Sequence, residues 1–150
     1  MASVIGNAAL KAIVDGTIDL NTSDIRAILV MTNTTADTEI DSTEFVYVGD
    51  LTTLDEADAT GYARIDMAGL AVNIDDANNR AEFDATDLSF TGLSGNATRD
   101  YQGVVLYKHV TNDTDSPVLC FIDFASDLAK EATQVDVVFD AEGVLQIAQA

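Results

Sequence analysis

The sequence predicts a mainly β protein, an antiparallel β-sandwich or a jelly-roll-like barrel with one or two short helices. Short apolar or alternating stretches recur along the chain, separated about every 8 to 12 residues by turns rich in Gly, Asn, Asp and Ser. No stretch keeps a helical period over a useful length. With 150 residues, 47% of them hydrophobic, the chain can bury a substantial core. We therefore expect a single β domain over residues 1–150.

The N-terminal part is predicted to hold a short helix followed by a buried strand. Asn7 can cap the helix AALKAIVD, and Gly16 can end it. The apolar run IRAILVM (25–31) is typical of a buried strand, and the polar residues 32–43 are expected to form a loop. Residues 1–24 have two interpretations. They are either a docking arm that lies along a neighbouring protein, since chain ends are free to do so, or an edge segment of the same domain.

The next stretch carries mixed signals. Residues 44–51 (EFVYVGDL) contain the β-branched and aromatic residues of a strand, but Asp41, three residues before Glu44, could also start a helix there. Thr53 and Glu56 have the spacing of a capping box, and Gly61 provides a stop. At least one short helix is therefore expected between residues 42 and 60.

From Gly61 onward the pattern is plainly β. Alternating or apolar stretches are separated by small polar turns such as DDANN and TNDTDS. The predicted strands are 62–75, 80–90, 101–110, 117–124, 133–139 and 144–148. Together with residues 25–31 and the ambiguous 44–51, this gives the number of short strands that a sandwich or barrel requires.

Residues 103–124 contain the only His, the only Pro and the only Cys of the chain. A reactive pair of His109 and Cys120 would need a group that lowers the thiol pKa and donors for an oxyanion, and neither is recognisable nearby. On the second predicted strand, one face carries Val118, Cys120, Ile122 and Phe124. A free Cys in such a row is usually inert core, so this stretch is predicted to be a plain β-hairpin.

The acidic residues do not single out a catalytic or metal site. The turns at 75–79 and 112–116 cluster oxygen ligands that could bind calcium, but they lack the spacing, the Gly and the final Glu of an EF-hand loop. Solvated turns are the preferred interpretation. One His and one Cys cannot form a zinc site. We therefore predict no catalytic, cofactor-binding or metal-binding residues, no cofactor, and a protein that is not an enzyme.

Charge limits the classes of partner. The chain has 26 acidic and 7 basic residues, a formal net charge of -19. Such a surface repels phosphate backbones and anionic lipids, so neither nucleic acid nor membrane is expected as a partner. No apolar run is long enough to span a bilayer, and synthesis in the cytoplasm is expected. Arg64, Arg80 and Arg99 either pair with local acids or anchor an acidic neighbour at a subunit contact.

Four stretches carry a resemblance to a known group of proteins. They are LKAIVDGTIDLNTSDIRAILV (10–30), ATGYARIDMAGLAV (59–72), YQGVVLYKHVTNDTDSPVLCFIDF (101–124) and VVFDAEGVLQI (137–147). In their order along the chain they resemble small virion structural proteins of tailed bacteriophages, of the capsid decoration (cement) type. The resemblance implies many copies on the capsid exterior, as homotrimers bound to the major capsid protein. It carries over no functional residues.

Two other classes of function stay open from the sequence. One is a tail, neck or fibre component of the same kind of virion. The other is a hydrolase or glycan-binding module, although the chain has no Trp to stack on a sugar ring.

Overall fold

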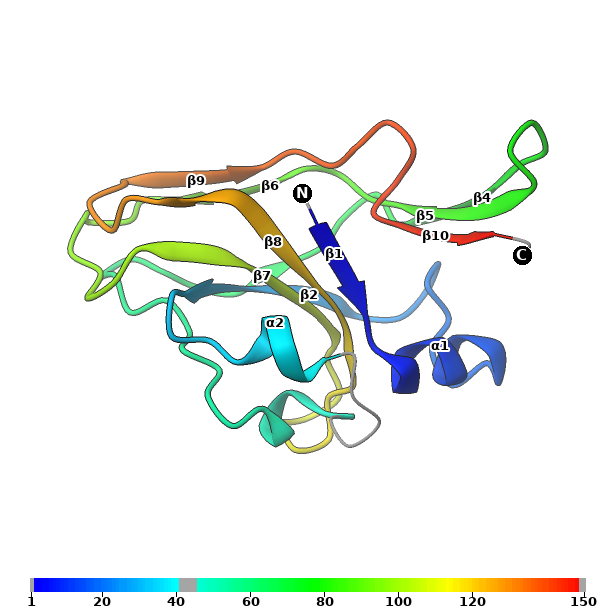
Figure 1. Cartoon of the computed structure of the whole chain (residues 1–150), viewed down its shortest axis with the longest axis horizontal. Helices are drawn as coiled ribbons and strands as arrows, with labels where there is room; N and C mark the ends of the chain where they lie inside the picture. The colour runs from blue at the N-terminus through cyan, green and yellow to red at the C-terminus, as the bar shows by residue number, and fades with distance from the viewer. Residues whose placement is uncertain (1, 41–45, 149–150) are drawn as a thin grey trace.

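The structure, a computed structural model, describes residues 2–40 and 46–148 (Figure 1). Strands account for 40% of the chain and helices for 11%, and every strand pair is antiparallel. The elements are β1 (Ala2–Ile5), α1 (Asn7–Val14), β2 (Ile25–Met31), α2 (Ala36–Glu39), the 3-10 helix η1 (Val48–Asp50), β3 (Ile65–Asp66), β4 (Ala71–Asp75), β5 (Arg80–Asp84), β6 (Leu88–Thr91), β7 (Tyr101–Lys108), β8 (Val118–Leu128), β9 (Gln134–Val137) and β10 (Leu145–Ala148). The predicted class, mainly β and antiparallel with one or two short helices, is confirmed, and the structure has two short α-helices.

A five-stranded sheet in the order β1-β8-β7-β2-β3 forms the centre of the molecule. Its inner strands β2 and β7 are buried along most of their length, because both faces of the sheet are covered. On one face, side chains such as Leu29 and Leu106 join the larger apolar cluster. On the other face, Ile28 and Val105 pack in a second cluster with residues of α2 and η1. This double burial explains why the 25–31 segment is apolar at consecutive positions.

Two smaller sheets cover the first face of the central sheet. The order is β10-β5-β4 in one and β6-β9 in the other. Phe83 and Leu145 from the three-stranded sheet share the larger cluster with Phe90 and Val135 from the two-stranded sheet. The sheets thus pack face to face around one core, as in a β-sandwich. The β4–β5 hairpin extends away from this core beside β10, at the right of Figure 1.

The predicted strands 62–75 and 80–90 are each wrong in extent, because each is divided between two sheets. The first holds β3 and β4, and the second holds β5 and β6. The two breaks lie against each other: the Thr86 N–H donates to the Ala68 carbonyl at 2.9 Å. Gly69 has a φ of +67°, and a Cβ there would lie 2.5 Å from the Thr86 hydroxyl. These irregular segments therefore form the corners at which the chain changes sheet.

The N-terminal residues form an edge strand followed by a helix. β1 pairs with β8, and the helix begins directly after it. The predicted cap at Asn7 is wrong by one residue, because the N-cap is Gly6, whose own N–H donates to the Leu119 carbonyl at 3.1 Å. Gly16, with a φ of +76°, follows the helix end as predicted. A docking role for residues 1–24 stays a prediction.

The helix predicted from Thr53 and Glu56 is absent from the described residues of that stretch. Thr53 instead exchanges hydrogen bonds with Thr35, at 2.9 and 3.0 Å. Glu56 forms a β-bridge with Val30. The only helical turn described between 42 and 60 is η1. Residues 41–45, which include the possible helix start at Asp41 and Glu44, lie outside the described residues. The predicted loop at 32–43 contains α2, a single helical turn. Tertiary hydrogen bonding thus overrides the local capping pattern.

Replacing Tyr101 with Phe should leave the protein as stable as before or more stable by up to about 1 kcal/mol. The Tyr101 side chain is fully buried, and its hydroxyl has no hydrogen-bond partner among the described residues. The matched change Tyr62→Phe should cost about 1 kcal/mol, since the Tyr62 hydroxyl donates to Glu56 at 2.9 Å and accepts from the Leu29 N–H at 3.3 Å. Urea unfolding of both variants measures the difference. A clear loss for Tyr101→Phe would contradict this.

Candidate functional site

The β7–β8 hairpin separates the two residues that could have formed a reactive pair. The predicted hairpin is confirmed, and Cys120 lies in the larger cluster opposite Leu106. The His109 ring packs edge-on against Tyr107, 6.3 Å between centroids, and Tyr107 belongs to the cluster on the other face. A register shift between Leu106 and Tyr107 also moves Val118 onto the Tyr107 face, so the predicted row through Val118 is wrong at that residue.

Cys120 should not react with a disulfide reagent while the protein is folded. Its side chain is fully buried, and burial raises the pKa of the thiol to about 12. The thiolate, which is the reacting form, is therefore scarce at neutral pH. Titration with 5,5′-dithiobis(2-nitrobenzoate) should show a slow native reaction that becomes fast in denaturant. His109→Ala should leave the native rate unchanged; a slower rate would indicate that the imidazole activates the thiol.

The oxygen-rich turns use their side chains to fix their own backbone. In the β4–β5 turn, Asp75 accepts hydrogen bonds from the N–H groups of Ala77 and Asn78 at 3.1 and 3.2 Å. In the β7–β8 loop, Asn112 accepts from the Thr114 N–H at 2.9 Å. Within residues 2–40 and 46–148, no three His, Cys, Asp or Glu side chains gather as ligands for a metal ion. Both turns have the hydrogen bonding of Asx-turns.

The three arginines singled out in the sequence pair with local acids, as one of the two interpretations predicted. Arg80 contacts three carboxylates, those of Asp75, Glu82 and Glu142. Arg99 pairs with Asp55, whose side chain is almost fully buried. Each of these pairs joins segments of the same chain, so their charges are already compensated within the described structure.

Arg64 stands at the centre of the most connected polar cluster. Its guanidinium binds both oxygens of Glu56 at 2.8 and 2.7 Å, and both oxygens of Asp113 at 2.6 and 2.9 Å. It also lies over the Tyr107 ring, 5.4 Å from the centroid. The hydrogen bonds from Arg64 lower the pKa of Asp113. Because Glu56 and Asp113 together occupy the whole fork of the guanidinium, Arg64 joins the segment before β3 to the β7–β8 loop and has a structural role.

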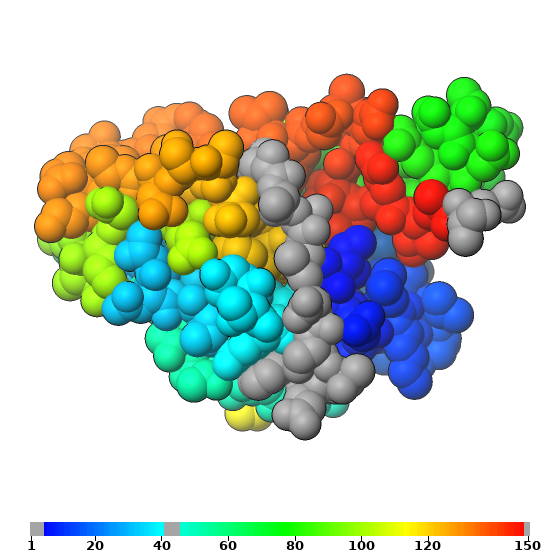
Figure 2. All heavy atoms as spheres, viewed as in Figure 1, coloured from blue at the N-terminus to red at the C-terminus, as the bar shows by residue number. Residues whose placement is uncertain are grey.

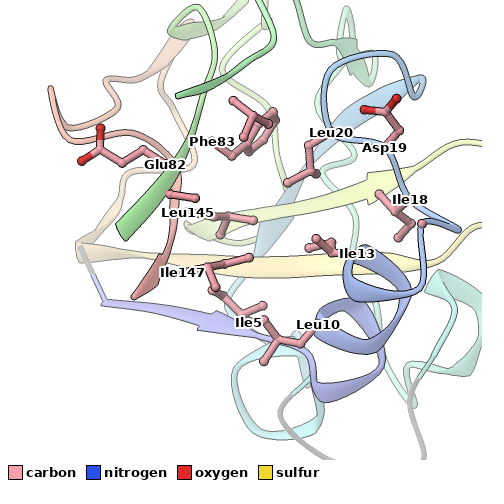
Figure 3. A pocket seen from close by; sticks show the side chains of 13 residues that line it. Ile5, Leu10, Ile13, Ile18, Asp19, Leu20, Glu82, Phe83, Leu145 and Ile147 are labelled. Atoms are coloured by element: carbon pink, nitrogen blue, oxygen red, sulfur yellow. The ribbon is translucent and has the colours of Figure 1, made fainter. Parts of the chain in front are cut away.

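An apolar groove lies between α1 and the three-stranded sheet. Its volume is about 470 Å³ (Figure 3). Leu10 and Ile13 of α1 form one wall, while Phe83, Leu145 and Ile147 form the wall of the sheet. The groove has this character because β4, β5 and β10 each place their apolar residues on the same face of the sheet.

A second hollow adjoins the groove. It has a volume of about 610 Å³ and is lined by Ile122 of β8 and by residues 138–140 and 142–146. Ile5 and Leu145 line both hollows, so the two meet where the edge strand β1 faces β10. Its lining includes the carboxylates Asp140 and Glu142, which makes it more polar than the groove.

Exposed apolar side chains continue the groove to the surface. Val14 at the end of α1 is 84% exposed and Ile74 of β4 is 81% exposed. Ile74, Ala81 and Ile147 lie side by side across the three strands, so the apolar face continues past the core. Figure 2 shows α1 in blue and the red and green strands as two projections on one side of the molecule. Exposed apolar surface on both sides of an apolar groove is typical of a binding site.

The groove was not predicted from the sequence, although one of its apolar walls has a recognisable sequence pattern. The alternation of Val72 and Ile74 with polar neighbours predicts an apolar strand face, but it cannot tell whether another element covers that face. Among the helices of the part of the chain that the structure describes, none is long and apolar enough to cross a membrane. Comparison of the chain with protein-family models, curated proteins and solved structures gives no match. The function of the groove therefore has to be inferred from its geometry and charge.

Proposed function

We propose that this chain is a structural protein of a tailed-bacteriophage virion, a capsid decoration protein that binds the major capsid protein on the outside of the head. In this proposal it acts as a homotrimer and stabilises the shell. The resemblance of residues 10–30, 59–72, 101–124 and 137–147 to such proteins supports it. The β-sandwich, whose polar clusters are engaged in internal pairing, suits a protein that acts by binding.

The observation that carries the proposal is the apolar groove with its exposed margins. Leu10, Ile13 and Ile147 offer apolar contact area without a convergent set of polar groups. A substrate site usually adds a few precisely placed polar groups to orient its ligand. A docking surface needs only complementary shape and an apolar centre. The groove therefore supports a binding role more than a catalytic one.

The charge of the chain supports an exterior position. A net charge of -19 disfavours contact with packaged DNA, whose phosphates are also negative. On the outside of the particle, the same charge keeps finished particles apart in solution. A protein that binds only the assembled lattice stabilises that lattice by mass action. Decoration of the outer surface combines these two properties.

Locating the chain in purified virions tests the proposal. Quantitative mass spectrometry should find it in hundreds of copies per particle, a number comparable to that of the major capsid protein. A particle reconstruction should place it on the head. Heads that lack it should lose their DNA at a lower temperature, and adding the purified chain should restore them.

Other outcomes would redirect the assignment. A handful of copies at the tail would instead favour a tail, neck or fibre component. Complete absence from particles would reject both virion roles. A specific signal on a glycan array or in a hydrolase screen would then favour the glycan-binding or hydrolase class.

A further inference from the structure

The outer edge of β10 opens into the second hollow. β10 is an end strand of its sheet, in the order β10-β5-β4, so β5 occupies its other edge. Leu145 and Gln146, two consecutive residues of β10, both line the hollow. Successive side chains of a strand point to opposite faces, so consecutive residues line the same hollow when it lies along the edge of their strand. Figure 1 shows β10 on the side of its sheet that is turned towards β1 and α1.

This edge of β10 carries backbone groups that no other strand satisfies. In an antiparallel sheet, every second residue of an end strand directs its N–H and C=O away from the sheet. Within residues 2–40 and 46–148, β5 is the only strand that pairs with β10, and no backbone hydrogen bond joins residues 145–148 to a further segment. An open edge of this kind is a template for one more strand.

The polar side chains of the hollow already take part in internal contacts. Glu142 pairs with Arg80 at 2.8 Å, and Asp140 accepts a hydrogen bond from the Glu142 N–H at 3.0 Å. The Gln146 side chain accepts from Arg80 at 3.0 Å and donates to the Glu142 carbonyl at 3.2 Å. Backbone groups of the strand edge are therefore the polar groups that this part of the described structure offers to a ligand.

Apolar side chains face the strand edge across the hollow. Ile122 of β8 and Ile5 of β1 belong to the wall of the central sheet, and Val138 and Phe139 extend the apolar lining. Figure 3 shows Ile5 beside Ile147 of β10. The volume of about 610 Å³ is within the range of ligand sites. A ligand would thus meet backbone hydrogen-bonding groups on one side and apolar side chains on the other.

We propose that an extended segment of another protein pairs with the free edge of β10 and adds a strand to the three-stranded sheet. Its backbone would continue the ladder, and its alternate side chains would be apolar and would pack against Ile5 and Ile122. β10 is four residues long, so the paired part of the segment would span roughly 13 Å. The inference goes beyond the proposed function, since strand addition does not depend on which protein supplies the segment.

The chemistry of the site disfavours two other occupants. A hydrocarbon chain would fill the apolar part of the hollow, but it would bury the N–H and C=O groups of the β10 edge without hydrogen-bond partners. A second copy of the chain would bring a further net charge of -19 into contact with the first. An extended segment of a different protein satisfies the strand edge and avoids the repulsion between two copies.

Selection from a random library of short peptides on the wild-type chain tests the edge directly. The selected peptides should alternate apolar and polar residues. Methylation of their backbone nitrogens, one residue at a time, should weaken binding by about tenfold or more at every second position and have little effect between, because only alternate N–H groups of an added strand donate to its neighbour. Hydrogen exchange of the amides in residues 145–148 should slow when a peptide binds.

Two exposed valines provide a matched pair of variants. Val138→Asp should weaken binding of the selected peptides by about tenfold or more, since it places a carboxylate in the apolar lining of the hollow. Val138 is 62% exposed, so the substitution leaves the fold intact. Val110 is 51% exposed and lies outside both hollows, and Val110→Asp should leave binding unchanged. Ile74→Asp should also leave it unchanged, because β4 is at the opposite end of the sheet.

Several results would overturn the inference. Failure to select any peptide would do so, as would methylation effects without a period of two residues, or equal binding by the wild type and Val138→Asp. Peptides that Ile74→Asp loses and Val138→Asp keeps would place the contact on the face of the sheet and not on its edge. Concentration-dependent self-association that Val138→Asp abolishes would assign the edge to a second copy.

The virion experiment separates this inference from the proposed function. If Val138→Asp loses the selected peptides yet still joins heads in wild-type amounts, the decoration role stands and uses another surface. If the wild type is absent from virions but binds peptides with the two-residue period, strand addition at β10 stands and the virion role fails.

Discussion

Gly103→Ala should destabilise the protein by about 3 kcal/mol or more, although it adds a single methyl group. Gly103 lies in β7, in the middle of the central sheet. A Cβ at this position would overlap the Ile122 carbonyl oxygen of β8 and lie 2.7 and 2.8 Å from two ring carbons of Phe121. The carbonyl belongs to a paired strand and cannot move without breaking the ladder. Urea unfolding monitored by circular dichroism measures the loss.

Gly16→Ala provides the control for the conformational cost of losing a glycine. Gly16 has a φ of +76°, and its Cβ would have nothing within 4 Å, so its substitution costs only backbone strain, about 1 kcal/mol. The φ of Gly103 lies outside the left-handed region, so its cost is steric. Adding Phe121→Leu to Gly103→Ala should recover part of the loss by removing the ring atoms. Equal losses at Gly16 and Gly103 would contradict the steric argument.

The central sheet could be predicted from the sequence because its strands carry a strong local signal. β2, β7 and the first five residues of β8 (118–122) are mostly apolar at consecutive positions, and nearly every one of these side chains is buried. Such a strand can be recognised without knowing which of its faces is covered, because both faces pack against apolar clusters. The corners at Gly69 and Thr86 were not predictable, because each break falls inside a run that keeps a β pattern on both sides.

Other features depend on contacts between distant segments. The helix expected at Thr53 and Glu56 does not form, because Thr53 pairs with Thr35, 18 residues away, and Glu56 forms a β-bridge with Val30, which is still further away in the chain. The shift that moves Val118 to the other face follows from a one-residue irregularity between β7 and β8, which no local pattern encodes. The groove, likewise, exists only because α1 and the three-stranded sheet meet at an angle that leaves their apolar faces partly uncovered.

Arg64→Met should lower the free energy of unfolding by about 2 kcal/mol at pH 7. Met keeps the apolar stem but removes the guanidinium that binds Glu56 and Asp113 through four hydrogen bonds. The two carboxylates are then left close together without a cation. Asp113 keeps 40% of its side chain exposed, so water recovers part of the loss, and the effect is smaller than for a fully buried pair.

Arg26→Met is the matched control for removing one arginine from an acidic protein. Its partners Asp24 and Asp66 are more exposed than Glu56, and the loss should stay below about 0.5 kcal/mol. Both variants raise the net negative charge by the same amount, so the general effect of charge cancels in the comparison. Equal losses for the two variants would show that the Arg64 cluster adds nothing specific.

The pH dependence gives the sharper test of the Arg64 cluster. Arg64 lowers the pKa of Asp113 in the folded state, so the stabilisation is complete above the ordinary Asp value near ~3.9 and is lost as pH falls through the lower folded value. The gap in stability between wild type and Arg64→Met should therefore be constant from pH 7 to about pH 5 and shrink below about pH 4. The total stability of so acidic a chain also changes with pH through its self-repulsion, which is why the gap, and not the absolute value, is the quantity to measure. A gap that persists undiminished to acid pH would mean that Arg64 stabilises the fold through its contact with the Tyr107 ring and not through its carboxylates.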